Sequence, residues 1–194
     1  MSAVILLGPP GVGKGTQAGW LAKALGVPAI STGQIFRTNI EDETELGKLA
    51  QTFIAQGDFV PDHVTNPMVA VRLSAPDAQR GFVLDGYPRS LEQAHALRDT
   101  LAKEDMRIDA VLELTAPADV LIARLAKRAS EENRADDKIE VFKHRLDVYK
   151  ERTEPLATYY ADLDLLEVVD ASGTPEEVAD AILAALRLRG VCEQ

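Results

Sequence analysis

The chain has 194 residues, of which 46% are hydrophobic, so it is long enough for one domain with a sizeable core. Its formal net charge of −10 argues against nucleic acid as the main partner, because phosphate backbones attract basic surfaces. The single cysteine, Cys192, excludes an internal disulfide and a cysteine-ligated zinc site.

The chain begins with a short apolar run at residues 3–7, which predicts a buried strand. This run lacks the basic flank of a signal peptide. No apolar stretch elsewhere approaches the ~20 residues that a membrane-spanning helix needs. We therefore expect a cytoplasmic protein with no membrane partner.

A glycine-rich segment, GPPGVGKGTQ, follows this strand directly at residues 8–17. Gly8, Gly13 and Lys14 match the spacing of a phosphate-binding loop, in which backbone N–H groups surround the anion. Gly15 stands where the pattern has a hydroxyl residue, and Thr16 comes one position later. The alternative is a purely structural glycine-rich turn that binds no ligand. The preceding strand, the spacing and the lysine all favour the phosphate loop.

In this loop we expect Lys14 to bind the transferred phosphate and Thr16 to hydrogen-bond a phosphate oxygen. The other phosphates would be surrounded by the backbone N–H groups of Gly11, Val12, Gly13, Lys14 and Gly15. The missing hydroxyl leaves Mg²⁺ without a direct protein ligand, which this ion tolerates because it retains several waters. Asp85, at the end of a later strand, could orient those waters, although it could also serve only as a turn residue.

Further elements in the first half of the chain alternate between strand and helix. Strands are expected at 27–31 and 82–84. Apolar residues at helical spacing predict helices at 14–25, 33–42, 44–56 and 62–74. Gly26 is expected to end the first of these helices.

The second half continues the alternation, with strands expected at 110–114 and 165–169 and a helix at 117–129. Two helix starts carry capping signals: Ser90 with Gln93, which opens a helix to Lys103, and Thr174 with Glu177, which opens the last helix. Residues 130–137 are polar and lack an apolar period. A long helical stretch follows them, with a break or kink at Pro155.

The expected strands are continuous apolar runs rather than alternating ones, which is typical of a parallel sheet covered on both faces. We therefore expect an α/β fold with a five-stranded parallel sheet flanked by helices on both faces. Ligands in such sheets gather at the carboxyl ends of the strands. The glycine loop and Asp85 should both lie on that edge.

Several segments together resemble the adenylate kinase family, in its short bacterial form that lacks the zinc-binding insertion of the lid. They are GPPGVGKGTQ, STGQIFR at 31–37, GFVLDGYPRSLEQ at 81–93, RLAKR at 124–128 and RADD at 134–137. The similarity extends from residue 3 to about residue 182. It implies a phosphate-loop nucleoside monophosphate kinase fold, with one kinase domain over 1–194. It further implies an AMP-binding helical subregion at 31–60, a short lid at 129–137, no structural zinc and a monomer.

The resemblance also implies an AMP site. Arg89 would pair with a phosphate, and Gln93 would hydrogen-bond to the edge of the adenine. The alternative is that Gln93 serves only in the cap of its helix. The full set of implied AMP-binding residues is Thr32, Gly33, Arg37, Asp58, Phe59, Val60, Gly86, Arg89, Gln93, Arg134 and Arg145.

On the ATP side, the resemblance implies that Arg124 stacks on the adenine and Arg128 meets the phosphates. These arginines are four apart on an expected helix and so share a face, which by itself could be a solvated basic face. Gly173 matches a loop that lies against the ATP base. Arg134 and Arg145 match two further phosphate-binding arginines. Asp136 and Asp137 match an acidic pair of the family, although without the family they would indicate a helix cap.

The chain departs from the family pattern in the lid. The segment from Ala129 to Asn133 is longer and more acidic than the tightest lids, and Lys138 and Ile139 replace more usual polar or acidic residues.

Seven basic residues from separated segments fall in these motifs of an acidic chain: Lys14, Arg37, Arg89, Arg124, Arg128, Arg134 and Arg145. Their ligands should be compact and highly charged, as two nucleotides meeting end to end would be. A nucleoside monophosphate is already largely ionised near pH 7, with a second pKa of about 6, so it needs no general base. We expect Mg²⁺-dependent transfer, ATP + AMP ⇌ 2 ADP, by alignment and charge stabilisation. The catalytic set would be Lys14, Arg89, Arg124, Arg134, Arg145 and Asp85.

Two other functions fit part of this pattern. A UMP or CMP kinase could use the same scaffold, but the pyrimidine enzymes that resemble this chain usually carry alanine where Thr32 stands. A regulator that senses ATP without turnover would not need the complete set of basic residues on both sides of the transfer point.

Overall fold

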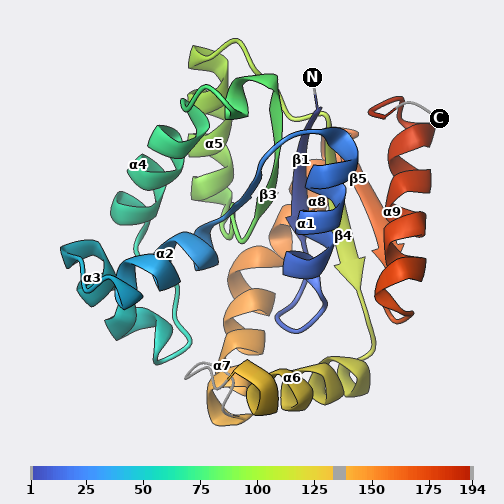
Figure 1. Cartoon of the computed structure of the whole chain (residues 1–194). Coiled ribbons are helices and arrows are strands. Elements are labelled where there is room, and N and C mark those ends of the chain that lie inside the picture. Colours follow the sequence, from blue (N-terminus) through green and yellow to red (C-terminus); the bar gives the residue numbers. More distant parts are fainter. Residues whose placement is uncertain (1, 133–138, 193–194) are drawn as a thin grey trace.

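The computed structural model describes residues 2–132 and 139–192 of the chain. Within these residues, five strands form one parallel sheet in the order β2-β3-β1-β4-β5. The strands are β1 (Ser2–Leu7), β2 (Ala29–Ser31), β3 (Gly81–Asp85), β4 (Ala110–Thr115) and β5 (Leu166–Asp170). Figure 1 shows helices on both sides of this sheet. The predicted α/β fold is therefore confirmed.

Strand β1 explains why the apolar runs in the sequence are continuous. Successive side chains of a strand point to opposite faces of the sheet. Val4 and Leu6 belong to one buried cluster, whereas Ala3 and Ile5 belong to another on the opposite face. Because both faces are covered, every position of the strand has to be apolar.

Helices cover the two faces in separate groups. The cluster with Val4 and Leu6 packs against side chains of α1 (Lys14–Leu25), α6 (Ala118–Glu132), α7 (Ile139–Val148) and α9 (Pro175–Leu188). The cluster with Ala3 and Ile5 packs against α4 (Asp62–Leu73), α5 (Leu91–Lys103) and α8 (Pro155–Asp162). Figure 1 shows α9 on the opposite side of the molecule from α4 and α5.

A third, smaller hydrophobic cluster lies away from the sheet, among α2 (Thr32–Glu41), α3 (Glu45–Ile54) and the residues leading to α4. Phe36, Ala50 and Val60 are its buried members. Gly47 allows α2 and α3 to approach closely, since a Cβ at this position would collide with the carbonyl oxygen of Asn39. This pair of helices projects from the rest of the molecule in Figure 1.

The sheet register brings the carboxyl ends of the central strands together. Asp85 pairs with Leu6 of β1 on one side and with Ser31 of β2 on the other. The glycine loop follows β1 directly, so it lies beside Asp85 as the sequence predicted.

Helix caps agree with the sequence in one case and differ in another. The capping box of Thr174 and Glu177 is present. The predicted box at Ser90 is wrong in its second half. The Ser90 hydroxyl accepts from the backbone N–H of Gln93 at 3.2 Å, but the Gln93 amide oxygen accepts from Arg89 N at 2.8 Å instead of from Ser90. The other end of the Gln93 amide donates to Asp62, the first residue of α4, and these two bonds fix the side chain away from Ser90 N.

Near the predicted lid, one helix end differs from expectation, whereas the predicted break at Pro155 is confirmed. Helix α6 continues to Glu132, beyond the expected end at residue 129. A π-helical turn at Tyr149–Thr153 separates α7 from α8, and Pro155 begins α8 as its first residue. Residues 133–137 of the expected lid, with Arg134, Asp136 and Asp137, lie outside the described residues, as do Lys138 after the lid and the side chain of Arg128. No helix in the described part of the chain is both long and apolar enough to cross a membrane.

Candidate active site

The glycine loop joins β1 to α1 and turns sharply three times. Gly8, Gly11 and Gly13 have φ angles of 138°, 84° and 103°, a region that side-chain-bearing residues rarely adopt. A Cβ at Gly8 would also come within 2.5 Å of the Leu114 carbonyl oxygen on β4. The glycines are therefore required by this backbone path, which ends at the N-terminus of α1.

Lys14 is the first residue of α1 and folds back over the loop. Its ammonium donates to the carbonyl oxygens of Gly8 at 2.6 Å and Pro9 at 3.0 Å. The helix N-terminus adds N–H groups and the positive end of the helix dipole to the same place. The loop, the helix N-terminus and the lysine thus have the arrangement that an anion-binding site requires, and binding itself stays a prediction.

Asp85 faces this loop from the end of β3. A Cβ built on Gly15 would lie 3.8 Å from Asp85 Oδ2, and the same oxygen accepts from the Ser31 hydroxyl at 3.2 Å. A held carboxylate beside the phosphate loop fits a magnesium ion bound through water. No group of three or more metal-ligating side chains is found among the described residues.

Arg124 of α6 ties the glycine loop to the loop after β5. Nη1 donates to the carbonyl oxygens of Val12 at 3.1 Å and Ala171 at 2.7 Å. Nη2 donates to those of Ser172 at 3.3 Å and Gly173 at 2.8 Å. The predicted ATP-site residues Val12, Arg124 and Gly173 are thus brought together, and the guanidinium holds the backbone between them.

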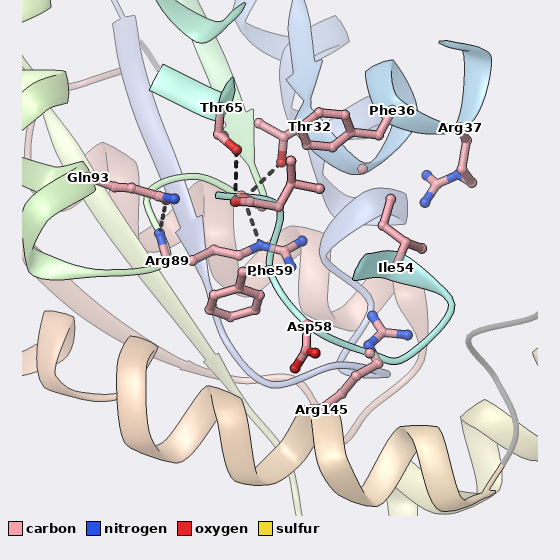
Figure 2. A pocket seen from close by; sticks show the side chains of 14 residues that line it. Thr32, Phe36, Arg37, Ile54, Asp58, Phe59, Thr65, Arg89, Gln93 and Arg145 are labelled. Atoms are coloured by element: carbon pink, nitrogen blue, oxygen red, sulfur yellow. Dashed lines mark hydrogen bonds between the residues drawn. The ribbon is translucent and has the colours of Figure 1, made fainter. Parts of the chain in front are cut away.

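A second site lies next to the loop, in a pocket shown in Figure 2. All of the expected AMP residues line it except Arg134, which lies outside the described residues: Thr32, Gly33, Arg37, Asp58, Phe59, Val60, Gly86, Arg89, Gln93 and Arg145. Sequence reasoning did not include four further lining residues, Phe36, Ile54, Gly57 and Thr65.

Hydrogen bonds to one carbonyl oxygen organise the part of this pocket around Thr32 and Arg89. The Thr32 hydroxyl and Arg89 Nε each donate to the Gly86 carbonyl oxygen at 2.8 Å (Figure 2). The Arg89 guanidinium also lies over the ring of Phe59, with 4.8 Å between Cζ and the ring centroid. Arg89 is therefore held in place by its surroundings.

Gln93 closes the pocket from α5 and is 2% exposed. In addition to its bond with Arg89 N, its Nε2 donates to Asp62 Oδ1 at 2.6 Å. Asp62 begins α4, where an acidic residue ordinarily complements the helix dipole. Sequence reasoning therefore gave no sign that Asp62 contacts Gln93, which is distant along the chain.

Helix α7 covers the pocket from the other side. Arg145 lines it, and the neighbouring His144 Nε2 lies 2.6 Å from Asp58 Oδ1. A Cβ at Gly57 would come within 2.9 Å of Arg145 Cγ, so glycine permits this close approach. The loop before α4 and the helix after the predicted lid are in direct contact.

The pocket of Figure 2 and the glycine loop are connected. A second pocket is lined by Gly8, Pro10 and Lys14 on the loop side and by Tyr149 and Thr153 from the π-helical turn. Four of its lining residues also line the first pocket: Phe59, Gly86, Arg89 and Arg145. Lys14 and Arg89 therefore border one continuous space.

Two groups near this space have shifted pKa values. Burial raises the pKa of the Glu113 carboxyl on β4, and the negative charge of Glu154 raises it further. Burial likewise raises the pKa of the Tyr149 hydroxyl, with added repulsion from Glu113 and Glu154.

Comparison with known proteins decides the family. A family model described as adenylate kinase matches residues 6–165. The chain belongs to the adenylate kinase family. It is similar to an adenylate kinase of Thermobifida fusca (strain YX), with 50% identity over 96% of this chain and 98% of that protein. It is also 52% identical to an adenylate kinase of Mycolicibacterium paratuberculosis (strain ATCC BAA-968 / K-10), over 94% of this chain and 98% of that protein. The resemblance predicted from the motifs is confirmed, and adenylate kinases are nucleoside monophosphate kinases.

Proposed function

We propose that the glycine loop binds ATP, that the pocket beside Thr32 binds AMP, and that the γ-phosphoryl group passes between them where the two pockets meet. The reaction is that of the adenylate kinase family, ATP + AMP ⇌ 2 ADP. The observation that carries the assignment is the shared lining of the two pockets, with Lys14 on one side and Arg89 on the other.

In this reaction, an oxygen of the AMP phosphate forms a bond to the γ-phosphorus of ATP while the bond to the departing ADP oxygen breaks. The AMP phosphate is ionised near pH 7, because its second pKa is about 6, so no side chain has to remove a proton. Lys14 and Arg89 would stabilise the charge on the transferring group. The residues of the chain then act mainly by alignment and electrostatics.

Magnesium would enter with ATP and neutralise phosphate charge. Asp85, held by Ser31 and facing Gly15, would hydrogen-bond to the waters of the magnesium ion. Thr16, in the first turn of α1, would hydrogen-bond to a phosphate oxygen. Arg128, Arg134 and Arg145 would meet phosphates from the lid side, and Arg124 would lie against the ATP adenine. We further propose that the protein is a cytoplasmic monomer without structural zinc and without a nucleic-acid partner.

A coupled assay that follows ADP formation tests the function, with AMP, UMP, CMP and GMP offered as acceptors at equal concentrations of Mg-ATP. We expect AMP to give by far the largest kcat/KM. A reaction without acceptor measures ATP hydrolysis and should be close to background. A preference for UMP or CMP, or hydrolysis as fast as transfer, would overturn the proposal.

A further inference from the structure

The side-chain amide of Gln93 has a direction that matters for nucleobase recognition. One end is a carbonyl that accepts hydrogen bonds, and the other is an NH₂ group that donates them. The two ends have nearly the same shape, so an amide rotated by half a turn would fill the same space. A base in the pocket would then meet the opposite pattern of donor and acceptor. The residues that contact the Gln93 amide therefore determine which pattern a bound base meets.

Both neighbours of the amide can bond in only one way. The backbone N–H of Arg89 only donates, and it lies 2.8 Å from Oε1 of Gln93. The Asp62 carboxylate, when ionised, only accepts, and its Oδ1 lies 2.6 Å from Nε2. A rotated amide would place its oxygen against the carboxylate and its NH₂ against the N–H group. Both contacts would be repulsive, so one orientation is enforced.

The backbone around Gln93 is also fixed, which prevents the amide from moving away from these neighbours. The Tyr87 hydroxyl oxygen lies 2.8 Å from Asn66 Oδ1 and 3.2 Å from the main-chain carbonyl oxygen of Gln93, so its one proton serves these two acceptors. The Ser90 hydroxyl accepts from the Gln93 N–H. Because the residue is almost fully buried, rotation of the amide is the simplest adjustment left to it.

We propose that Asp62 is a specificity-determining residue, which fixes the Gln93 amide so that the pocket accepts adenine and rejects 6-oxopurines. Each end of the amide retains one more hydrogen-bonding position, a lone pair on Oε1 and an N–H on Nε2. Adenine offers the matching edge, with a donor at N6 and an acceptor at N1. Hypoxanthine and guanine offer the reverse, an acceptor at O6 and a donor at N1. The inference rests on the AMP site proposed above.

IMP is the most direct probe, since its base differs from that of AMP only in this edge. The measured quantity is kcat/KM for IMP divided by kcat/KM for AMP, with ATP as donor. In Asp62→Asn, the new amide can present either of its ends to Gln93, so the rotated orientation loses one repulsive contact. We expect the ratio to rise about tenfold, which corresponds to one ordinary hydrogen bond. The KM for ATP should not change.

Two further variants make this test specific. Asp62→Ser carries the same prediction, because a hydroxyl can donate or accept, and it decides the matter if Asp62→Asn does not fold. Asp77→Asn is the matched control, because it removes a carboxylate that bonds to Arg72 of the same helix α4 and lines neither of the two pockets. This control should leave the ratio unchanged.

Calorimetric binding of AMP and IMP to the wild-type protein provides a check that needs no variant. We expect AMP to bind at least about tenfold more tightly. Equal binding of the two would overturn the inference. An unchanged ratio in the Asp62 variants, or an equal loss with both acceptors, would also overturn it, since a purely structural residue affects both alike. A wild-type enzyme that does not phosphorylate AMP would instead overturn the proposed function.

Discussion

The glycine loop, which we propose holds the phosphate donor and call the donor loop, comes from one continuous segment, β1 to α1. The pocket beside Thr32, which we propose holds the acceptor and call the acceptor pocket, collects residues from α2, α3, the loop before α4, α4, the β3–α5 connection, α5 and α7 (Figure 2). The donor loop presents backbone N–H groups, which bind any suitably placed phosphate. The acceptor pocket presents side chains held by other side chains, such as Gln93 by Asp62.

This difference has a functional consequence. Backbone recognition of phosphate is strong but does not distinguish one nucleotide from another, so discrimination between acceptor nucleotides has to come from the side-chain network of the acceptor pocket. Changes on the donor side should therefore affect the rate of transfer, and changes on the acceptor side should affect which nucleotide is used and how tightly. The following predictions test that division, beginning with the largest effect.

Removal of divalent ions should abolish the function of the donor loop and leave that of the acceptor pocket intact. Chelation should stop turnover, because phosphate charge on the donor side is no longer neutralised, and magnesium alone should restore it. Calorimetric affinity for AMP should be nearly unchanged. The melting temperature without nucleotide should also be unchanged, since we expect no zinc in the lid.

Metal analysis gives the result that would contradict this prediction, and a ligand gives its control. Stoichiometric zinc in the purified protein would show that the short-lid prediction is wrong. A bisubstrate mimic that joins two adenosines through five phosphates serves as the positive control, and it should raise the melting temperature by mass action.

Lys14→Ala should have the next largest effect. It removes a positioned charge at the transferring phosphate, which is worth about 3 kcal/mol, or about two orders of magnitude in kcat. Stopped-flow or coupled assays measure the rate, and calorimetry should show AMP affinity retained. Lys23→Ala, an exposed lysine on the same helix, is the control and should be close to wild type. Near-normal kcat in Lys14→Ala would show that the loop is not the donor site.

Thr32→Ala should act on the acceptor side alone. The loss of its hydrogen bond to the Gly86 carbonyl oxygen loosens the pocket, and we expect the KM for AMP to rise about fivefold, equivalent to about 1 kcal/mol. Thr38→Ala, an exposed threonine of the same helix, is the control. If the KM for ATP rises while that for AMP does not, the two sites have been assigned the wrong way round.

The smallest effect concerns Glu113, whose carboxyl pKa is raised by burial and by the charge of Glu154. Above the ordinary Glu pKa of about 4.3, the unfolded chain releases this proton more readily than the folded protein, so the contribution of Glu113 to stability falls as pH rises. Glu113→Gln removes that loss and should raise the melting temperature at about pH 8, with no gain at about pH 4. A gain of equal size at both pH values would contradict the titration of Glu113.

Local patterns in the sequence were sufficient for the elements and for the donor loop. Apolar runs at residues 3–7 and 82–84 predicted the strands because burial on both faces leaves no polar positions. Glycine spacing before Lys14 predicted the loop because its backbone angles exclude other residues. The family motifs added the residues of the acceptor pocket, and the structure brings together those that it describes.

Tertiary structure alone decided how those residues are connected. The sequence predicted Gln93 as a partner of Ser90 in a capping box, because capping is a local interaction; the fold brings Asp62 within 2.6 Å of the same amide, from a helix 31 residues earlier. The sequence placed Arg124 on the ATP side, and the fold alone shows that its guanidinium meets carbonyl oxygens of the glycine loop and the loop after β5. Spacing along the chain determines which residues share a local element, whereas contacts between distant segments depend on how the helices pack on the sheet, which no local pattern records.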